Sequence, residues 1–266
     1  MTEQRRSDSD VEAALKQRFR ARVLAGGQIV SDAIADELGP HADDPAWIKA
    51  NFSNLVETIQ TRAFDLYKAS ERTAAGEALV EVFNELVPKN ASAADVISLL
   101  KEYVHALDRF FLGLTQGRRP RAGNAFEKLT VDLFTRLRYP FTLRPAIDGT
   151  PDFVLPSVEL YHTNPLSVLI FTVKRTLRER WRQIVTEGSR GLGFYLATID
   201  ENVSARDLAE MMRAKVHLVV PARLKQDIPR YAAAGNVLSF EEFFTHHLDP
   251  AVRRWKAGTG KSRRKP

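Results

Sequence analysis

The chain has 266 residues, of which 44% are hydrophobic and 27% are charged, the proportions of a soluble globular protein that can bury a core without covalent cross-links. It contains no cysteine, which excludes disulfides and thiolate metal sites and fits a reducing cytoplasm. Lys and Arg number 39 against 33 Asp and Glu, and the net charge of +6 favours a polyanionic partner such as nucleic acid. We expect no membrane partner, because no apolar run approaches ~20 residues and the polar N-terminus is not a secretory signal.

The pattern of apolar residues in the first part of the chain predicts helices. Apolar residues recur at helical spacing over residues 11–38, where Gly26-Gly27 should interrupt the helix, and again over residues 51–68. We therefore expect a helical N-terminal region over residues 1–116 that serves dimerisation, DNA wrapping or both.

A capping box marks the start of a later helix. Ser92 with Asp95 is the pattern in which two side chains satisfy backbone N–H groups reciprocally, and the helix should run on through Phe111. We expect the turn GRRPRAG, residues 117–123, to end it. A further amphipathic helix is predicted over residues 124–137.

After residue 138 the pattern changes to short β-rich runs that alternate with helical patterns. The predicted strands are 139–143, 153–155, 167–173, 194–199 and 216–220, and the predicted helices are 177–187 and 205–212. This alternation predicts an α/β (α+β) fold with a mixed central β-sheet flanked by helices, over residues 117–250. The basic segment 251–266 is predicted to be disordered.

Two predicted strand ends carry the residue types that phosphodiester hydrolysis needs. Asp152 opens one strand and Lys174 closes the next, so a hairpin would bring their side chains together. A carboxylate binds a hard cation such as Mg²⁺, and an ammonium group can lie near the attacking water or the phosphate. The pair is weak evidence by itself, since a lysine at the end of an apolar strand usually just reaches to water.

A second acid is missing from its usual place. Nucleases of the PD-(D/E)XK class normally carry an acid two residues before the lysine, where this chain has Thr172. The next predicted helix offers Glu187, 187 − 174 = 13 residues after the lysine, and the preceding helix offers Glu127.

The segment after the lysine carries a resemblance to a known family. Residues 178–183 read R-E-R-W-R-Q, and both this run and the intervals of 22 and 13 residues around Lys174 match one pattern. The chain resembles type II restriction endonucleases of the EcoRII and PspGI branch, in which the second acid has moved from the strand to the following helix. The resemblance covers roughly residues 121–231.

This resemblance implies a site and a substrate. Asp152 and Glu187 would bind Mg²⁺, Lys174 would support the attacking water, and Glu127 would be an accessory acid, at a shorter interval from Asp152 than in the relatives. The substrate would be double-stranded DNA with a palindromic CC…GG site, of the CCNGG, CCWGG or CCGG type. The enzyme would be a homodimer or tetramer in a bacterial or archaeal cytoplasm, with a DNA methyltransferase as its genetic partner.

The run also has a physical interpretation of its own. Arg178, Glu179 and Arg180 stand at a predicted helix N-terminus, where arginine can bind guanine O6 and N7 and glutamate can accept from cytosine N4. Two such subunits would read a palindrome with CC and GG halves. The alternative is a solvated amphipathic helix with charge pairs along it.

Other candidates are weaker. Arg118, Arg119 and Arg121 could grip phosphates, although a solvated turn explains them nearly as well. Trp47 could stack on an extruded central base, but a buried aromatic anchor explains it better.

Two other functions compete with restriction. One is a repair or structure-specific nuclease, against which the Arg-Glu-Arg triplet argues. The other is a catalytically silent DNA-binding relative, against which the survival of three site residues argues. Metal-dependent hydrolysis would separate the silent protein from both nucleases.

Overall fold

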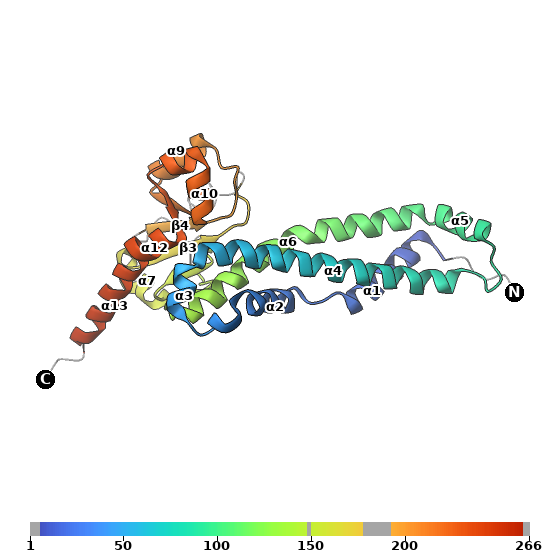
Figure 1. Ribbon diagram of the computed structural model, residues 1–266, viewed down its shortest axis with the longest axis horizontal. Coiled ribbons are helices and arrows are strands. Elements are labelled where there is room, and N and C mark those ends of the chain that lie inside the picture. Colours follow the sequence, from blue (N-terminus) through green and yellow to red (C-terminus); the bar gives the residue numbers. More distant parts are fainter. Residues whose placement is uncertain (1–5, 148–149, 178–192, 263–266) are drawn as a thin grey trace. The chain divides into compact units, whose positions relative to one another are not determined.

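The structure is a computed structural model that describes residues 6–147, 150–177 and 193–262 (Figure 1). Its contacts divide the chain into two compact units. The first contains Met1–Ala33 and Arg62–Ala122, and the second contains Ile34–Thr61 and Gly123–Pro266. Residues 34–61 thus group with the sheet-containing unit, whereas the sequence placed them in the helical N-terminal region 1–116.

Helices make up the chain before the sheet. They are α1 (Asp8–Arg22), α2 (Gly26–Leu38), the short η1 (Gly39–His41), α3 (Pro45–Ala50), α4 (Phe52–Leu86), α5 (Ala93–Glu102) and α6 (Val104–Arg136). The break between α1 and α2 falls at residues 23–25, directly before the glycine pair that was predicted to interrupt the helix, and the pair itself begins α2. Ser92 with Asp95 forms the predicted capping box of α5.

The core of the first unit is apolar and lies between α1, α4, α5 and α6. Leu15 and Phe19 of α1 pack in one cluster with Ala78 of α4 and Phe110 of α6, and all four are at most 4% exposed. Burying such side chains stabilises a helical bundle far more than the intrinsic helix propensity of the segments does.

Two helix predictions in this region were wrong. The helix from Ser92 ends at Glu102, because Tyr103 caps it with non-helical dihedrals, and α6 begins at the next residue. The predicted turn at 117–123 does not form, since α6 continues through Pro120 to Arg136. Proline removes one backbone hydrogen bond from a helix, and side-chain contacts from both flanks of this proline to α4 help to offset that loss.

The second unit is built on a six-stranded mixed sheet in the order β1-β2-β3-β4-β5-β6. The strands are β1 (Thr142–Leu143), β2 (Phe153–Leu155), β3 (Leu169–Val173), β4 (Gly193–Ala197), β5 (Val216–Val220) and β6 (Val237–Ser239). β1, β2 and β3 pair antiparallel, and β3 to β6 pair parallel. The predicted mixed α/β fold is confirmed; β6 was not predicted.

Helices cover both faces of this sheet. The connecting helices are α7 (Val158–Thr163), η2 (Pro165–Ser167), α9 (Ala205–Arg213), α10 (Ala222–Asp227) and α11 (Pro229–Ala233). On one face Val154 and Ile170 share a cluster with Leu208 of α9 and Leu224 of α10. On the other face, Phe134 of α6 packs against β2 and β3. Its ring centroid lies 5.7 Å from that of Phe153 and 5.3 Å from that of Phe171.

The C-terminal part of the described chain is helical. It consists of α12 (Phe240–Phe243), η4 (Phe244–Leu248) and α13 (Asp249–Ser262). Helix α13 therefore occupies much of the segment for which disorder was predicted, and Ala251 is fully buried. No helix within the described ranges is long and apolar enough to cross a membrane.

Candidate active site

The predicted hairpin is present and joins the two predicted catalytic side chains. Asp152 directly precedes β2 and Lys174 directly follows β3, and these strands pair antiparallel. The Lys174 ammonium nitrogen lies 3.1 Å from Oδ2 of Asp152 and 3.4 Å from Oδ1. Strand pairing thus explains how residues 22 positions apart (174 − 152) come into contact.

Backbone groups hold Asp152 in place. Its Oδ2 accepts a 2.8 Å hydrogen bond from the Val173 N–H, and its carbonyl oxygen accepts one of 2.8 Å from the Arg144 N–H. The Asp152 side chain is 11% exposed, whereas that of Lys174 is 40% exposed. The carboxylate is therefore fixed at the edge of the core, and the ammonium group remains open to a ligand from solvent.

Thr172 occupies the place opposite Asp152. The Asp152 N–H lies 3.4 Å from Thr172 Oγ1, and Thr172 is 1% exposed. The hydroxyl brings no charge, so it cannot replace the acid that usually stands there. Among the described residues, no group of three or more acids and histidines could hold a metal ion.

Glu127 lies near this site but is engaged by a residue that the sequence did not reveal. From α6, its side chain binds the Arg144 guanidinium through Nε and Nη2, each at 2.8 Å. The hydrogen bond that Arg144 donates to Glu127 raises the pKa of Arg144, and the Arg144 backbone N–H donates to the Asp152 carbonyl. Arg144 thus links the two acids. Only its position at the end of the predicted strand 139–143 could have suggested it.

The segment that carries the remaining predicted residues lies outside the described part. It contains Glu187 and the Arg178, Glu179 and Arg180 triplet. The chain leading into it is anchored, because the Leu177 N–H donates to Asp200 Oδ2 at 2.9 Å.

Asp200 was not predicted as a site residue. It follows β4, whose carboxyl end lies at the same sheet edge as that of β3 because the two strands are parallel. Thr198 Oγ1 also donates to the Arg175 carbonyl at 3.2 Å, so two bonds fix the turn after Lys174. The signal in the sequence was an acid directly after the predicted strand 194–199.

The predicted phosphate-binding arginines make contacts inside the helical unit. The Arg118 guanidinium forks onto Glu71, with Nε 3.1 Å from both carboxylate oxygens, and the Glu71 side chain is only 4% exposed. Arg121 donates to the Tyr67 hydroxyl at 2.6 Å. These contacts favour a role in holding α6 against α4 over a role in phosphate binding. The Arg119 side chain lies outside the described part.

Trp47 belongs to the second unit. Its ring stacks on His41, with centroids 4.1 Å apart and planes 9° apart, and Asp44 caps its short helix. A face already stacked on a neighbour favours the interpretation of Trp47 as an aromatic anchor over one as a base-stacking residue.

The comparisons with known proteins agree on one family. The family described as "EcoRII C terminal" matches residues 83–244, well over half of the chain. The chain belongs to the EcoRII C-terminal family. The predicted resemblance to type II restriction endonucleases of the EcoRII and PspGI branch is confirmed.

Two curated relatives are restriction enzymes. The type II restriction enzyme SsoII of Shigella sonnei is 24% identical over 265 residues, which cover 95% of this chain and 86% of that protein. The type II restriction enzyme EcoRII of Escherichia coli is 31% identical over 149 residues, which cover 52% of this chain and 37% of that protein. The similarity to SsoII therefore extends into the helical unit.

Solved structures of the same branch share the fold. Metal-depleted Ecl18kI in complex with uncleaved, modified DNA superposes with a TM-score of 0.77 at 24% identity, covering 94% of this chain and 86% of that one. The PspGI–substrate DNA complex gives 0.64 at 18% identity, covering 87% and 94%.

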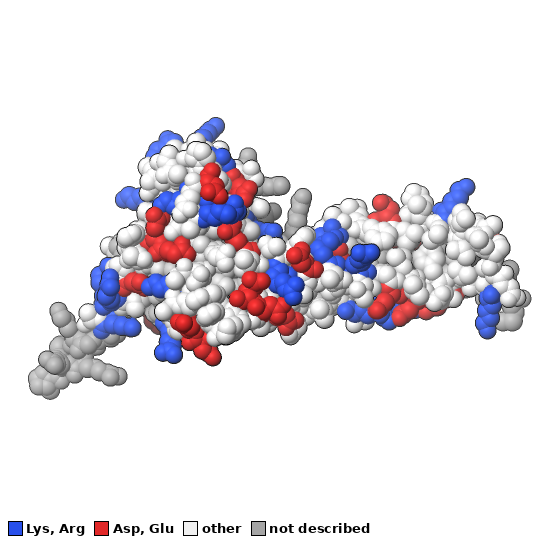
Figure 2. Space-filling model, viewed as in Figure 1, with Lys and Arg blue, Asp and Glu red and all other residues white. Residues whose placement is uncertain are grey.

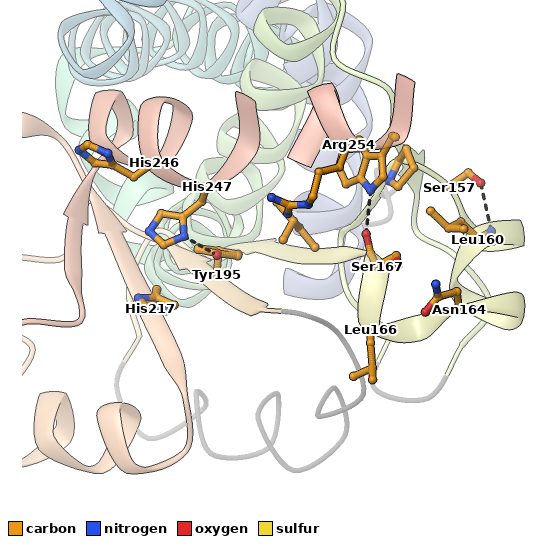
Figure 3. Close-up of a pocket in the computed structure, with 13 residues that line it drawn as sticks. Ser157, Leu160, Asn164, Leu166, Ser167, Tyr195, His217, His246, His247 and Arg254 are labelled. Atoms are coloured by element: carbon orange, nitrogen blue, oxygen red, sulfur yellow. Dashed lines mark hydrogen bonds between the residues drawn. The ribbon is translucent and has the colours of Figure 1, made fainter. Parts of the chain in front are cut away.

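A cavity of about 1030 Å³ lies at the other end of β3 from Lys174 (Figure 3). Its wall includes Tyr195, whose hydroxyl lies 2.9 Å from His247 Nδ1 and whose ring stacks on His217. Burial lowers the pKa of His217, and burial with the charges of two neighbouring histidines lowers that of His247. Asp152 and Lys174 do not line this cavity, so it is separate from the candidate active site.

Proposed function

We propose that this type II restriction endonuclease hydrolyses both strands of duplex DNA at a palindromic CC…GG-containing site, with Mg²⁺ as its cofactor. The observation that carries the proposal is the contact between Asp152 and Lys174 at a strand edge, in a chain of this family. The site type is CCNGG, CCWGG or CCGG, with or without flanking bases.

The donor set near Lys174 suits a hard cation but needs completion. Asp152 offers carboxylate oxygens fixed by the backbone, which is the ligand type that Mg²⁺ prefers. A single carboxylate is a poor site, and Thr172 adds no charge beside it. We therefore assign the second metal ligand to Glu187, on the segment that follows Leu177.

The chain's own residues divide the remaining work. Mg²⁺, when bound, polarises a phosphoryl oxygen and helps to form hydroxide at neutral pH. Lys174 presents a half-exposed ammonium that can orient the attacking water or donate to the scissile phosphate. Glu127, held by Arg144, acts as an accessory acid that positions the loop before Asp152 rather than as a metal ligand.

Base recognition is assigned to Arg178, Glu179 and Arg180. Arginine binds guanine in the major groove through two hydrogen bonds, and each good pair contributes ~1–3 kcal/mol of discrimination. The triplet starts four residues after Lys174 (178 − 174), and Asp200 anchors the preceding residue, Leu177. Contacts to bases and catalysis would therefore depend on one short turn.

A palindrome needs a two-fold assembly. We propose a homodimer, or a tetramer of two such dimers, in which each subunit cuts one strand. The enzyme would act in the cytoplasm, where a DNA methyltransferase protects the host's own sites. The solved relatives that share this fold contain DNA, which supports duplex DNA as the substrate class.

A digest tests this proposal. Plasmid DNA incubated with the purified protein and Mg²⁺ should give discrete fragments, and sequencing of their ends should place every cut at a CC…GG site. Diffuse degradation, or a preference for nicked or mismatched DNA, would instead identify a nuclease of another class.

A further inference from the structure

The cavity beside the start of β3 is lined by neutral groups and one cation. Its volume of about 1030 Å³ lies near the upper end of the roughly 300–1,000 Å³ that small-molecule sites occupy. We name it the histidine cavity, because His217, His246 and His247 line it (Figure 3). Tyr195 and Arg254 line it too, and none of its described lining residues is acidic. Such a wall favours an anionic ligand over a cationic one.

The inner wall of the histidine cavity is a group of three rings. Tyr195 is 3% exposed, and its hydroxyl lies 2.9 Å from His247 Nδ1. Its ring stacks on that of His217, its register partner on β5, with centroids 5.2 Å apart. The centroids of the His217 and His247 rings are also 5.2 Å apart. Side chains from two strands and η4 therefore converge on one wall.

The helix that carries two of the histidines has a rare backbone form. His246 and His247 lie on η4, which is a π-helix. Turns of this kind are uncommon in proteins, and they occur frequently at functional sites. The form of η4 is an observation separate from the shape of the histidine cavity, and both point to a ligand site at the same place.

One nitrogen of the inner wall has no hydrogen-bond partner within the described part of the chain. This atom is Nδ1 of His217, and it is buried. Buried polar atoms in folded proteins nearly always have a partner, because burying one without a hydrogen bond costs stability. A ligand with a polar group that enters the histidine cavity can supply this hydrogen bond.

Arg254 supplies the positive charge of the histidine cavity. Its side chain is exposed and makes no ion pair with the other residues that the structure describes. Burial raises the pKa of Tyr195 to about 12, and the charge of Arg254 opposes this rise, so the guanidinium acts on the inner wall. In Figure 2, Lys and Arg side chains gather over the part of the molecule where α13 lies in Figure 1. A guanidinium without a carboxylate partner can bind two phosphate oxygens at once.

We propose that the histidine cavity binds a small organic phosphate ester, with its phosphate at Arg254 and its apolar part against the apolar side of the wall. A phosphate offers three strong acceptor oxygens, which suit the guanidinium and the N–H groups of the imidazoles and of Asn164. The apolar side of the wall consists of Pro156, Leu160, Leu166, Leu169 and Trp255. Leu166 is 69% exposed, so a ligand can cover apolar surface there.

Two other occupants are disfavoured. A metal ion is one, because no group of three or more histidines and acids among the described residues could hold it. The other is a phosphate of duplex DNA, because a cavity with a buried inner wall suits a small molecule better than a rod-like polymer. The inference does not rest on the proposed function, since neither Asp152 nor Lys174 lines the histidine cavity.

Substitutions at two neighbouring arginines test the assignment. Arg254→Gln removes the guanidinium of the histidine cavity. Arg253→Gln is the matched control, because Arg253 is exposed on the same helix but does not line the cavity. Both proteins carry a formal charge of 6 − 1 = +5, so they separate a local interaction from the effect of net charge. A third variant, His217→Phe, keeps a ring and removes the buried nitrogen.

Equilibrium dialysis without divalent cation measures the binding of naphthyl phosphate and of its two halves, inorganic phosphate and naphthol. The wild type should bind naphthyl phosphate at least ~10-fold more tightly than either half, because only the whole ester meets the cation and the apolar wall. Arg254→Gln should weaken this binding by ~10-fold or more, and His217→Phe by roughly 3-fold. Arg253→Gln should stay within about twofold of the wild type.

Equal weakening in the two arginine variants would overturn the inference, because it would reveal only an effect of net charge. Equal affinity of the wild type for naphthyl phosphate and inorganic phosphate, or no binding of naphthyl phosphate, would also overturn it. Duplex DNA should not displace naphthyl phosphate, and displacement would assign Arg254 to DNA phosphates instead. Cleavage is not part of this readout. A wild type that cuts no CC…GG DNA would refute the proposed function and leave the result on the histidine cavity standing.

Discussion

Thr172 shows how one substitution can remove an acid from a metal site while the strand pairing around it is unchanged. It is 1% exposed, and its backbone lies opposite Asp152 across the β2–β3 pair. An acid at this place would be within reach of the same cation. The proposed transfer of the second ligand to Glu187 therefore leaves the strand geometry unchanged.

This geometry predicts a rescue. Glu187→Gln should reduce Mg²⁺-dependent cleavage by ~100-fold or more, equal to ~2.7 kcal/mol of transition-state free energy. Adding Thr172→Asp should recover at least ~10-fold of that loss, because the new carboxylate lies opposite Asp152. Single-turnover rates over a Mg²⁺ titration measure both effects. If the double variant is no faster than Glu187→Gln, the two positions do not serve the same ion.

Two partly buried histidines give the stability a pH dependence. Burial lowers the pKa of His217, and burial together with the charges of His217 and His246 lowers that of His247, from an ordinary value of 6.5. Below pH 6.5 the unfolded chain binds more protons than the folded one. Their contribution is therefore fully present above pH 6.5 and is lost as the pH falls through 6.5 towards the lowered values.

Urea unfolding between pH 5 and pH 8 checks this sign. The free energy of unfolding should decrease below about pH 6.5 in the wild type and less steeply in His247→Gln. His105→Gln is the matched control, because His105 is exposed on α6. Equal pH dependence in all three proteins would show that protonation of the partly buried imidazoles does not change the free energy of unfolding.

At the scale of elements, the packing of α4 against α6 depends on a buried ion pair. Glu71 on α4 is nearly inaccessible and Arg118 on α6 forks onto it. Burial alone would raise the pKa of Glu71, but the hydrogen bonds from Arg118 and Tyr67 outweigh it, and the pKa is lowered.

The effects of removing the two partners should therefore not be additive. Glu71→Gln should lower the free energy of unfolding by ~1–3 kcal/mol, because the Arg118 guanidinium then faces a neutral amide. The double variant Glu71→Gln with Arg118→Met should lose less than the sum of the single losses. Chemical denaturation of the four proteins gives this cycle. Additive losses would mean that the two side chains act independently.

Several elements follow from local patterns alone. Short β-rich runs predicted β2, β3, β4 and β5, which are largely buried in the fold. The capping box of Ser92 and Asp95 predicted the start of α5. The strand β6 was not predicted.

Other features depend on tertiary interactions that a local pattern cannot show. Pro120 signals a helix end in sequence, yet α6 continues because its side chains bind α4 on either side of the proline. The pair Asp152 and Lys174 was predictable from strand ends. Arg144 and Asp200 were not, since their roles come from backbone hydrogen bonds formed in the fold.

At the scale of the whole molecule, the two compact units differ in kind. The described residues of the first form helices and no strand, and the second carries the sheet and the candidate active site. The family match begins at residue 83 and so includes part of each unit. We propose that the helical unit serves dimerisation, DNA wrapping or both.

The proposed palindromic site predicts how many protein chains bind one DNA duplex. With one cognate duplex the protein should form a complex of two chains per duplex, because each chain reads one half of the site. Light scattering after size-exclusion chromatography measures the mass, with a duplex of scrambled sequence as the control. A complex of one chain per duplex that still cuts both strands would contradict the two-fold arrangement.

The most direct test of the account compares binding and cleavage in two variants of the hairpin site. Asp152→Asn and Lys174→Met keep the size of each side chain, so the fold and binding of a CC…GG duplex should be retained within about threefold. Single-turnover cleavage with Mg²⁺ should fall by ~100-fold or more in each. Cleavage at the wild-type rate in either variant would place the chemistry elsewhere in the chain.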